Sequence, residues 1–340
     1  MKHLQNVLYI LTENSYLYCE NETICVKVGG LEKVRIPAHT IESIICLCNT
    51  TVSTPFIGFC GKNKISLSFH GPNGAFYGRI YGPVNGNVLL RQKQYEIIGK
   101  SDAVEIVRNI LQGKILNSRN TLMRAARGAT AERETVLRNA ASLLIEQSEL
   151  IGAADSIDSL RGIEGAAATI YFRVFDEMLK TEEEDMRFEK RSRRPPENRV
   201  NAVLSFVYML LKNDVQSALE SVGIDPAAGY LHMLRPGRPS MALDLMEELR
   251  SPLCDRFVIS LINLKQIKSD SFDVEGGVFC LKDEPRRLVI KEWQTRKKET
   301  LIHPFLKEKI PIGLIPYCQA MLLARYLRSD IDGYPPFIWR

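Results

Sequence analysis

The first 80 residues consist of short runs in which β-branched and aromatic residues dominate, and Gly, Asn or Pro turns separate these runs. Such runs predict short β-strands. The stretch at 55–61 indicates a short helix under the sheet, and the glycine- and proline-rich stretch at 71–87 favours a loop-rich junction. The strands are expected at 7–11, 16–19, 24–28, 33–36, 41–47 and 65–69.

From about residue 88 the apolar residues recur every three or four positions, which predicts amphipathic helices. Pro195 and Pro196 exclude a continuous helix through 181–198, where an acidic run precedes several arginines. The chain is therefore expected to be an α+β multidomain protein, with a β-rich N-terminal domain at 1–87 and an all-α domain at 88–340. The helices are expected near 89–98, 101–126, 130–151, 155–180, 199–221, 240–267 and 312–328.

Composition agrees with an ordinary globular protein of two domains, because the 340 residues are 45% apolar and 25% charged. A net charge of +5 is compatible with nucleic-acid binding but does not establish it. The eight cysteines form no CxxC pair, which argues against a zinc ribbon and favours reduced thiols in the cytoplasm. The N-terminus lacks the pattern of a signal peptide, and no apolar run is long enough to predict a membrane span.

Four residues in the helical part carry side chains that bind hard metal ions, namely Glu164, His232, Asp244 and Glu247. Each lies among apolar residues, where a carboxylate is unfavourable unless something pairs with it. Two carboxylates and an imidazole together suit Mn²⁺ or Mg²⁺. Such an ion can drive phosphodiester chemistry, because it activates an attacking oxygen and stabilises charge on the phosphate.

Each of these residues also has a purely structural interpretation. Glu164 alone could be a carboxylate at a helix start, stabilised by the helix dipole. His232 alone could be a hydrogen-bonded core residue. Asp244, Glu247 and Glu248 at i, i+3 and i+4 could form a solvated acidic face paired to the following arginine. Like charges that close repel each other unless a cation or a proton lies between them, so a functional interpretation stays open beside the structural one.

Two basic turns are candidates for DNA phosphate contacts. Arg193 and Arg194 precede a pair of prolines, and Arg235 and Arg238 follow His232 in a turn rich in Pro and Gly. A stiff turn can hold arginines against phosphates, although a solvated connector is the alternative. Basic residues carried by helices could also follow a DNA backbone, or could be ordinary surface charge: these are Arg108, Lys114, Arg119, Arg124, Arg127, Arg133 and Arg138.

Four motifs follow one another in the helical part. They are Gly-x-Glu-Gly-(small)₃-x-x-Tyr-Phe at 162–172, Arg-Arg-Pro-Pro-x-Asn-x-x-Asn-Ala-x-Leu-Ser-Phe-x-Tyr at 193–208, Gly-x-x-His-x-x-x-x-Gly-Arg at 229–238 and Ser-x-x-x-Asp-Leu-x-Glu at 240–247. Taken in this order, they resemble the CRISPR-associated integrase of spacer acquisition, the metal-dependent DNase of CRISPR adaptation. Motifs at 36–43 and 74–79 extend the resemblance to nearly the whole chain.

The resemblance implies an N-terminal β-domain that builds a homodimer, and a helical catalytic domain that binds Mn²⁺ or Mg²⁺. The family's metal ligands fall on Glu164, His232 and Glu247. Asp244 matches a second family acid and is the alternative third ligand. The resemblance also implies double-stranded DNA as substrate, a small ferredoxin-like CRISPR adaptation partner that bridges two dimers in a heterohexamer-type complex, and an accessory exonuclease.

The reaction that the resemblance implies is transesterification, in which a 3′-hydroxyl of a captured DNA fragment attacks a phosphodiester of the repeat array. With water as the nucleophile, the same site would be an endonuclease. One alternative is a DNA-binding scaffold without catalysis of its own, in which the acids only pair with buried arginines. Another is an unrelated metal-dependent phosphoesterase that acts on small substrates.

Overall fold

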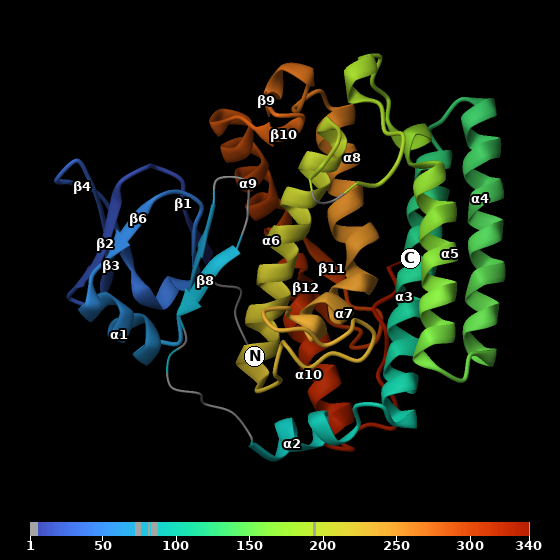
Figure 1. Ribbon diagram of the computed structural model, residues 1–340, viewed down its shortest axis with the longest axis horizontal. Coiled ribbons are helices and arrows are strands. Elements are labelled where there is room, and N and C mark those ends of the chain that lie inside the picture. Colours follow the sequence, from blue (N-terminus) through green and yellow to red (C-terminus); the bar gives the residue numbers. More distant parts are fainter. Residues whose placement is uncertain (1–5, 72–75, 81, 83–87, 193–194, 340) are drawn as a thin grey trace. The chain divides into compact units, whose positions relative to one another are not determined.

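A computed structural model describes residues 6–71, 76–80, 82, 88–192 and 195–339, which belong to two compact units (Figure 1). The first unit comprises Met1–Asn85 and Ile290–Glu299, and the second comprises Gly86–Val289 and Thr300–Arg340. Strands dominate the first unit and helices dominate the second, so the predicted α+β class is confirmed. The first unit also takes up a segment from far along the chain, which the change of pattern near residue 88 does not indicate.

The first unit contains two four-stranded sheets. In one sheet β1 (Asn6–Ile10), β5 (Ile41–Cys46) and β7 (Ser66–His70) run parallel, and β8 (Phe76–Ile80) is antiparallel to β7. In the other, β2 (Ser15–Glu20), β3 (Thr23–Val28) and β4 (Leu31–Pro37) are antiparallel neighbours, and β6 (Thr50–Val52) lies parallel to β2. Both sheets and the helix α1 (Thr54–Lys62) contribute residues to one apolar core, which includes Leu17, Ile44 and Phe56.

The strand β8 lies within the stretch 71–87, for which the sequence predicts a loop-rich junction and no strand. Its first two residues, Phe76 and Tyr77, are exposed, and Gly78 follows them, so no buried alternation reveals the strand in the sequence. Hydrogen bonding to β7 defines it instead. The predicted helix at 55–61 is present as α1, because the Ser53 hydroxyl accepts a hydrogen bond from the Phe56 amide and Pro55 lies in the first turn.

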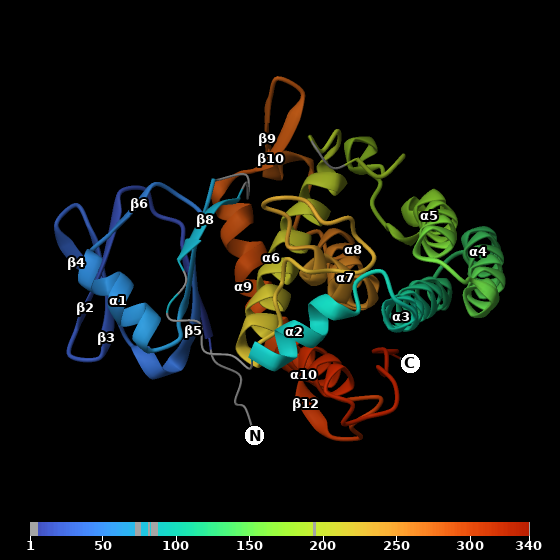
Figure 2. The ribbon, with the colours of Figure 1, turned by 60° about the horizontal axis from the view of Figure 1, so that its bottom comes forward.

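The second unit is a set of packed helices in which α3, the longest, contacts α4, α5 and α7. Figure 2 shows α3, α4 and α5 side by side. The helices are α2 (Val88–Glu96), α3 (Ser101–Ala126), α4 (Ala131–Leu150), α5 (Ile157–Arg173), α6 (Arg199–Val222), α7 (Ser240–Leu249), α8 (Arg256–Asn263) and α10 (Ile315–Leu327). A further helix, α9 (Asp283–Lys298), was not expected; it begins in the second unit and ends in the first.

The helix expected at 240–267 is interrupted. α7 ends at Leu249, and a π-helical turn at Arg250–Asp255 precedes α8. Pro252 lies inside this turn and has no amide hydrogen, so the regular α-helical hydrogen bonding cannot continue through it. The turn begins at Arg250, whose guanidinium lies 2.9 Å from the carboxylate of Glu247.

The expectation of an all-α second domain is wrong in detail, because two short hairpins lie within 88–340. They are β9 (Phe272–Glu275) with β10 (Val278–Leu281), and β11 (Thr300–Ile302) with β12 (Lys309–Pro311). Strands of three or four residues leave too little alternation to be recognised. The first hairpin did carry a signal in the sequence, namely the pair Gly276-Gly277. Both residues have positive φ, as a two-residue hairpin turn requires.

Helix ends in this unit follow from local sequence. Ser156 caps α5 by accepting a hydrogen bond from the Ser159 amide, and Asn198 caps α6 in the same way through the Asn201 amide. Gly223, with φ of +89°, ends α6. Among the described residues, no helix is long and apolar enough to cross a lipid bilayer.

Candidate metal centre

Glu164 lies well inside α5, seven residues after the helix begins at Ile157. The interpretation as a helix-start carboxylate is therefore wrong, because the dipole acts mainly within the first turn. Added Cβ atoms at Gly162 and Gly165 would meet no described atom within 4 Å, so these glycines do not serve close packing of a neighbouring helix. Gly162, Gly165 and Ala166 are exposed, whereas Ala167 is buried.

His232 lies in the loop between α6 and α7, and Asp244 of α7 holds this loop in place. Asp244 is fully buried. One of its oxygens, Oδ2, accepts hydrogen bonds from the amides of Tyr230 (2.6 Å) and Leu231 (2.9 Å). The other oxygen, Oδ1, accepts from the His232 amide (2.9 Å) and lies 2.6 Å from the ring nitrogen Nδ1 of His232. Both oxygens of Asp244 are thus occupied by contacts that fix the backbone of residues 230–232 and the ring of His232.

The contact between Asp244 and Nδ1 determines which ring nitrogen of His232 is available to bind a metal. A carboxylate at Nδ1 favours the tautomer that carries its proton there. The other nitrogen, Nε2, then has a free lone pair, and it lies 3.7 Å from Oε1 of Glu247. A neutral imidazole with a free Nε2 and a carboxylate behind Nδ1 is the arrangement that metal-binding histidines commonly have.

Glu247 is nearly inaccessible to solvent, with 4% of its surface exposed. Burial by itself raises the pKa of this carboxyl, but the positive charges of Arg250 and Lys114 outweigh burial and lower the pKa to about 2. Arg250 lies 2.9 Å from Oε1, and Lys114 lies 2.8 Å from Oε2. Glu247 is therefore an anion at neutral pH.

Lys114 joins the two halves of the site, because its ammonium also donates a hydrogen bond to Oε1 of Glu164. The structure thus brings Glu164, His232 and Glu247 into one network, with Glu164 and Glu247 sharing the Lys114 ammonium and His232 facing Glu247. Within the described part of the chain, Oε2 of Glu247 is buried and accepts no hydrogen bond of good geometry, although it pairs with the Lys114 charge.

These residues fit a hard divalent cation. Two carboxylates and one imidazole are a donor set that suits Mn²⁺ and Mg²⁺. The buried Oε2 of Glu247, which contacts the Lys114 ammonium, is an oxygen of the kind that binds a cation. Like-charged carboxylates this close also need a positive charge between them, and the Lys114 ammonium contacts both.

Glu248 belongs to a different cluster from Glu247. Its carboxylate accepts hydrogen bonds from the Tyr334 hydroxyl, from the Gln319 amide (2.9 Å) and from the Phe337 backbone amide (2.7 Å). Burial raises the pKa of Glu248 to about 7, in spite of these donors. The expectation that Asp244, Glu247 and Glu248 share a solvated acidic face is therefore wrong, since all three are buried and Glu248 serves the C-terminal segment.

Sequence reasoning missed two residues that hold the His232 loop. The Arg161 guanidinium on α5 donates a hydrogen bond to the Leu231 carbonyl (2.8 Å) and so ties this loop to the helix of Glu164. A Cβ at Gly229 would lie 2.5 Å from the Ser240 backbone and 2.7 Å from Oδ2 of Asp244. Spacing gives no hint of the Arg161 contact, but Gly229 is part of the motif that ends at residue 238.

A buried polar cluster lies behind the site. Asp255, at the end of the π-helical turn, accepts hydrogen bonds from the hydroxyls of Tyr208 (2.6 Å) and Tyr171 (3.0 Å). The Arg250 guanidinium, which pairs with Glu247, lies 5.1 Å from the centre of the Tyr208 ring. Burial raises the pKa of Asp255 to about 6. This cluster therefore packs against Arg250, the arginine that neutralises Glu247, through the Tyr208 ring.

The predicted DNA-binding arginines differ in what the structure says of them. Arg193 and Arg194 lie outside the described residues. Arg235 is exposed and Arg238 is half-buried, in a turn closed by the hydrogen bond from the Arg238 amide to the Arg235 carbonyl (3.1 Å). Among the helix-borne basic residues, Arg108 donates to the carbonyl groups of residues 151 and 154, so this guanidinium is engaged within the chain.

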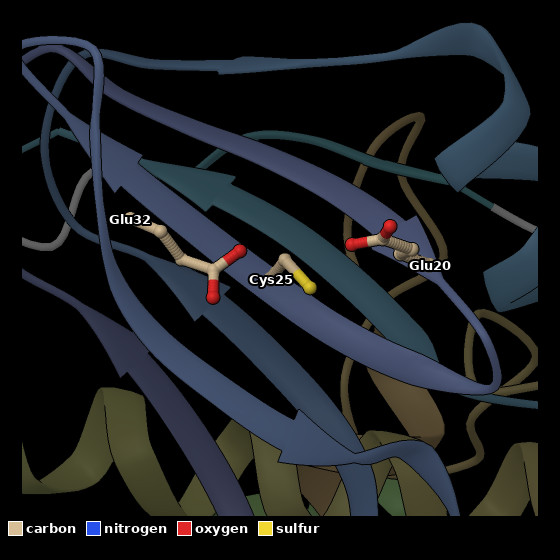
Figure 3. Close-up of side chains that lie close together, drawn as sticks. All are labelled: Glu20, Cys25 and Glu32. Carbon is tan, nitrogen blue, oxygen red and sulfur yellow. The ribbon is translucent and has the colours of Figure 1, made fainter.

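A second group of potential ligands lies on the sheet of β2, β3 and β4, where Glu20, Cys25 and Glu32 come close together (Figure 3). The Arg35 guanidinium donates hydrogen bonds to both Glu20 (2.6 Å) and Glu32 (3.1 Å). Both glutamates are exposed and Cys25 is buried. Exposed carboxylates that already share a guanidinium need no metal, and this group supports no metal-site assignment.

Comparisons with known proteins bear on the whole chain. A family described as CRISPR associated protein Cas1 matches residues 8–295. A CRISPR-associated endonuclease Cas1 of Chlorobaculum tepidum is 46% identical over 100% of this chain and 99% of the relative. A CRISPR-associated exonuclease Cas4/endonuclease Cas1 fusion of Rhodospirillum rubrum is 32% identical over 97% of this chain and 57% of the relative.

Solved structures agree with these matches. The CAS1 protein TM1797 of Thermotoga maritima has a TM-score of 0.83 and 25% identity, with 98% of this chain and all of that chain covered. A chain of a Cas6-RT-Cas1–Cas2 complex shares the fold, with a TM-score of 0.84 and 24% identity over 100% of this chain and 36% of that chain.

Proposed function

The chain belongs to the Cas1 family of CRISPR-associated proteins and is an endonuclease of CRISPR adaptation, and we propose that it inserts short DNA fragments into a CRISPR repeat array in a metal-dependent reaction. Full-length identity of 46% to a relative named an endonuclease supports the nuclease activity. The observation that supports the metal-dependent chemistry is the network of Glu164, His232 and Glu247, in which Lys114 joins the two carboxylates and Nε2 of His232 lies 3.7 Å from Glu247.

We infer that Glu247, and not Asp244, completes the set of ligands. Asp244 is fully buried, and hydrogen bonds to residues 230–232 occupy both of its oxygens. Glu247 has a buried oxygen that accepts no hydrogen bond in the described chain. Asp244 then acts as a positioning residue, which holds Nε2 of His232 toward the site.

A divalent ion held by Glu164, His232 and Glu247 would activate the attacking 3′-hydroxyl and offset the charge that develops on the scissile phosphate. The chain itself supplies the orientation of the ligands. Arg250 keeps the Glu247 carboxylate ionised and in place, Asp244 keeps a lone pair on His232 available, and Arg161 ties the His232 loop to α5. With water in place of the 3′-hydroxyl, the same arrangement cleaves DNA.

Double-stranded DNA is the proposed substrate. Arg235 and Arg238 lie in the turn that begins three residues after His232, so their guanidinium groups are carried by the same loop as the catalytic imidazole. Contacts of arginine with phosphate oxygens position DNA without reading its sequence. Arg193 and Arg194 remain proposed phosphate contacts on the strength of the sequence motif alone.

The proposed assembly is a homodimer built through the first unit, joined to a small ferredoxin-like partner of CRISPR adaptation. The outer strand β4 exposes Leu31 and Val34, and an exposed apolar edge needs a partner to cover it. The fold shared with a chain of a Cas1–Cas2 complex supports a partner of this class. The relative that is fused to Cas4 supports an accessory exonuclease.

Strand transfer of a short DNA duplex in the presence of Mn²⁺ tests the proposal. Glu164→Ala and His232→Ala should each abolish cleavage and strand transfer while DNA binding and the dimer persist, because DNA affinity rests on arginines. Glu149→Ala removes an equal charge from the exposed face of α4 and should have no effect. Full activity of Glu164→Ala, or activity that EDTA leaves unchanged, would favour a scaffold without catalysis of its own.

A further inference from the structure

Lys114 occupies an unusual position for a lysine. It lies in α3, its side chain is 14% exposed, and its ammonium contacts Glu164 of α5 and Glu247 of α7. Burying two carboxylates is unfavourable unless a positive charge compensates them. This compensation comes from Lys114, at the oxygens that the proposed metal ion would use.

We propose that Lys114 is a resident counter-ion of the metal centre, which holds Glu164 and Glu247 together in the metal-free protein and competes with the divalent cation for their oxygens. The inference rests on the proposed function, because it assigns a role to one more residue of the same site. Lys114 is a positioning residue, since it acts through the two carboxylates and not on the reacting atoms.

The contacts of Glu247 show why Lys114 must be the cation that gives way. Oε1 faces the Arg250 guanidinium at 2.9 Å, and Arg250 is in turn packed over the Tyr208 ring. Oε2 contacts the Lys114 ammonium at 2.8 Å, and among the described residues it accepts no hydrogen bond of good geometry. A divalent ion that reaches Oε2 comes within about 2.0–2.6 Å of it and repels the ammonium already there.

The chemistry of lysine suits such an exchange. Its ammonium is a compact point charge at the end of four flexible methylene groups, so it can leave two carboxylates without movement of α3. Arginine could not do the same, because its planar guanidinium makes bidentate contacts that are costly to break. Gly113, the residue before Lys114, lets α3 approach α7 closely, since a Cβ there would lie 3.0 Å from Glu248.

The test is a titration of full-length protein with Mn²⁺ alone, in which free Mn²⁺ is measured by electron paramagnetic resonance. Lys114→Met keeps the length of the side chain and removes its charge. We expect it to lower the Kd for Mn²⁺ by on the order of tenfold or more, because the cation no longer competes with an ammonium for the same oxygens. Lys114→Arg retains the charge and should not show this gain.

A matched control is Lys190→Met, which removes a lysine from an exposed ion pair with Glu197 (3.3 Å) and should leave the Kd unchanged. Thermal unfolding provides a second readout. Without metal, Lys114→Met should melt at a lower temperature than the wild type, and saturating Mn²⁺ should raise its melting temperature by more than it raises that of the wild type. A purely structural lysine would produce the first effect without the tighter binding.

The outcomes separate this inference from the proposed function. Unchanged or weaker Mn²⁺ binding by Lys114→Met, while Glu164→Gln still abolishes binding, would overturn the role of Lys114 and leave the metal centre standing. Mn²⁺ binding that Glu164→Gln does not affect would overturn the metal centre itself, and the role of Lys114 with it. If Lys114→Met does not fold without metal, refolding in Mn²⁺ that fails to rescue it also overturns the inference.

Discussion

Replacing Gly229 with alanine tests whether the His232 loop is held as tightly as the structure indicates. The new Cβ would lie 2.5 Å from the Ser240 carbonyl carbon, and 2.7 Å from both the Met241 amide nitrogen and Oδ2 of Asp244. Two of these neighbours are backbone atoms of α7, and the third is fixed by hydrogen bonds from Tyr230 and Leu231. The loop must therefore move away from α7.

We expect Gly229→Ala to lower the free energy of unfolding by about 2.5–6 kcal/mol, because overpacking costs about 1–3 kcal/mol and a hydrogen bond to a charged acceptor contributes about 1.5–3 kcal/mol. Strand transfer should fall further than stability alone explains, since the same movement displaces His232. Urea unfolding followed by circular dichroism measures the first effect, and Mn²⁺-dependent strand transfer below the unfolding transition measures the second.

Gly162→Ala is the matched control, because an added Cβ there meets no described atom within 4 Å and the residue lies within α5. Alanine at a helical position that accommodates it should raise stability by about 0.5–1 kcal/mol. Wild-type stability and activity in Gly229→Ala would refute the argument, since the loop would then tolerate displacement from Asp244.

Three further predictions follow from the site. Glu247→Gln should abolish Mn²⁺ binding in a calorimetric titration, whereas Asp244→Asn should weaken it by about 10–100-fold, as for a residue that orients a ligand. An equal loss of binding in both variants would contradict the assignment of Glu247 over Asp244 as the third ligand. The pKa of Asp255 is raised to about 6 from an ordinary value of 3.8, so the folded state holds this proton more tightly than the unfolded state. Its contribution to the free energy of unfolding is therefore largest below pH 4 and falls by about 3 kcal/mol as the pH rises to 6. In urea unfolding across this pH range, the free energy of unfolding of Asp255→Asn should not show that decrease. Arg235→Ala should weaken DNA binding to a similar extent for all sequences and reduce the slope of log affinity against log salt by about one unit, and a loss that depends on base sequence would indicate base contacts instead.

Most elements could be predicted because their apolar patterns record which face is buried. The helices from α3 to α6 begin and end within a few residues of the expected positions, apart from the end of α5, and short runs rich in Val, Ile and Tyr become β1 to β5. The failures include the whole of α9 and several short elements. β8 lies within a glycine-rich stretch and exposes its first residues, and the hairpins of residues 272–281 and 300–311 are too short to show a period.

The ligands of the site could be proposed from sequence because Glu164, His232 and Glu247 lie in motifs with recognisable spacing. The residues that hold these ligands in place could not be proposed from the sequence. Lys114 resembles the other basic residues of its helix, and only the packing of α3 between α5 and α7 brings its ammonium to both carboxylates. Arg161 likewise becomes important only because its guanidinium reaches a backbone carbonyl of the loop between α6 and α7.

Glu247 and Glu248 show why such roles are invisible in the sequence. They are adjacent and both buried, yet the pKa of Glu247 is about 2 and that of Glu248 is about 7. Burial raises both, but Glu247 faces the charges of Arg250 and Lys114, whereas neutral hydroxyl and amide groups surround Glu248. One residue is thereby kept as an anion that a cation can bind, and its neighbour anchors the C-terminal segment. The difference comes from which partners α7 meets on each side, and apart from Arg250 those partners lie more than 60 residues away in the chain.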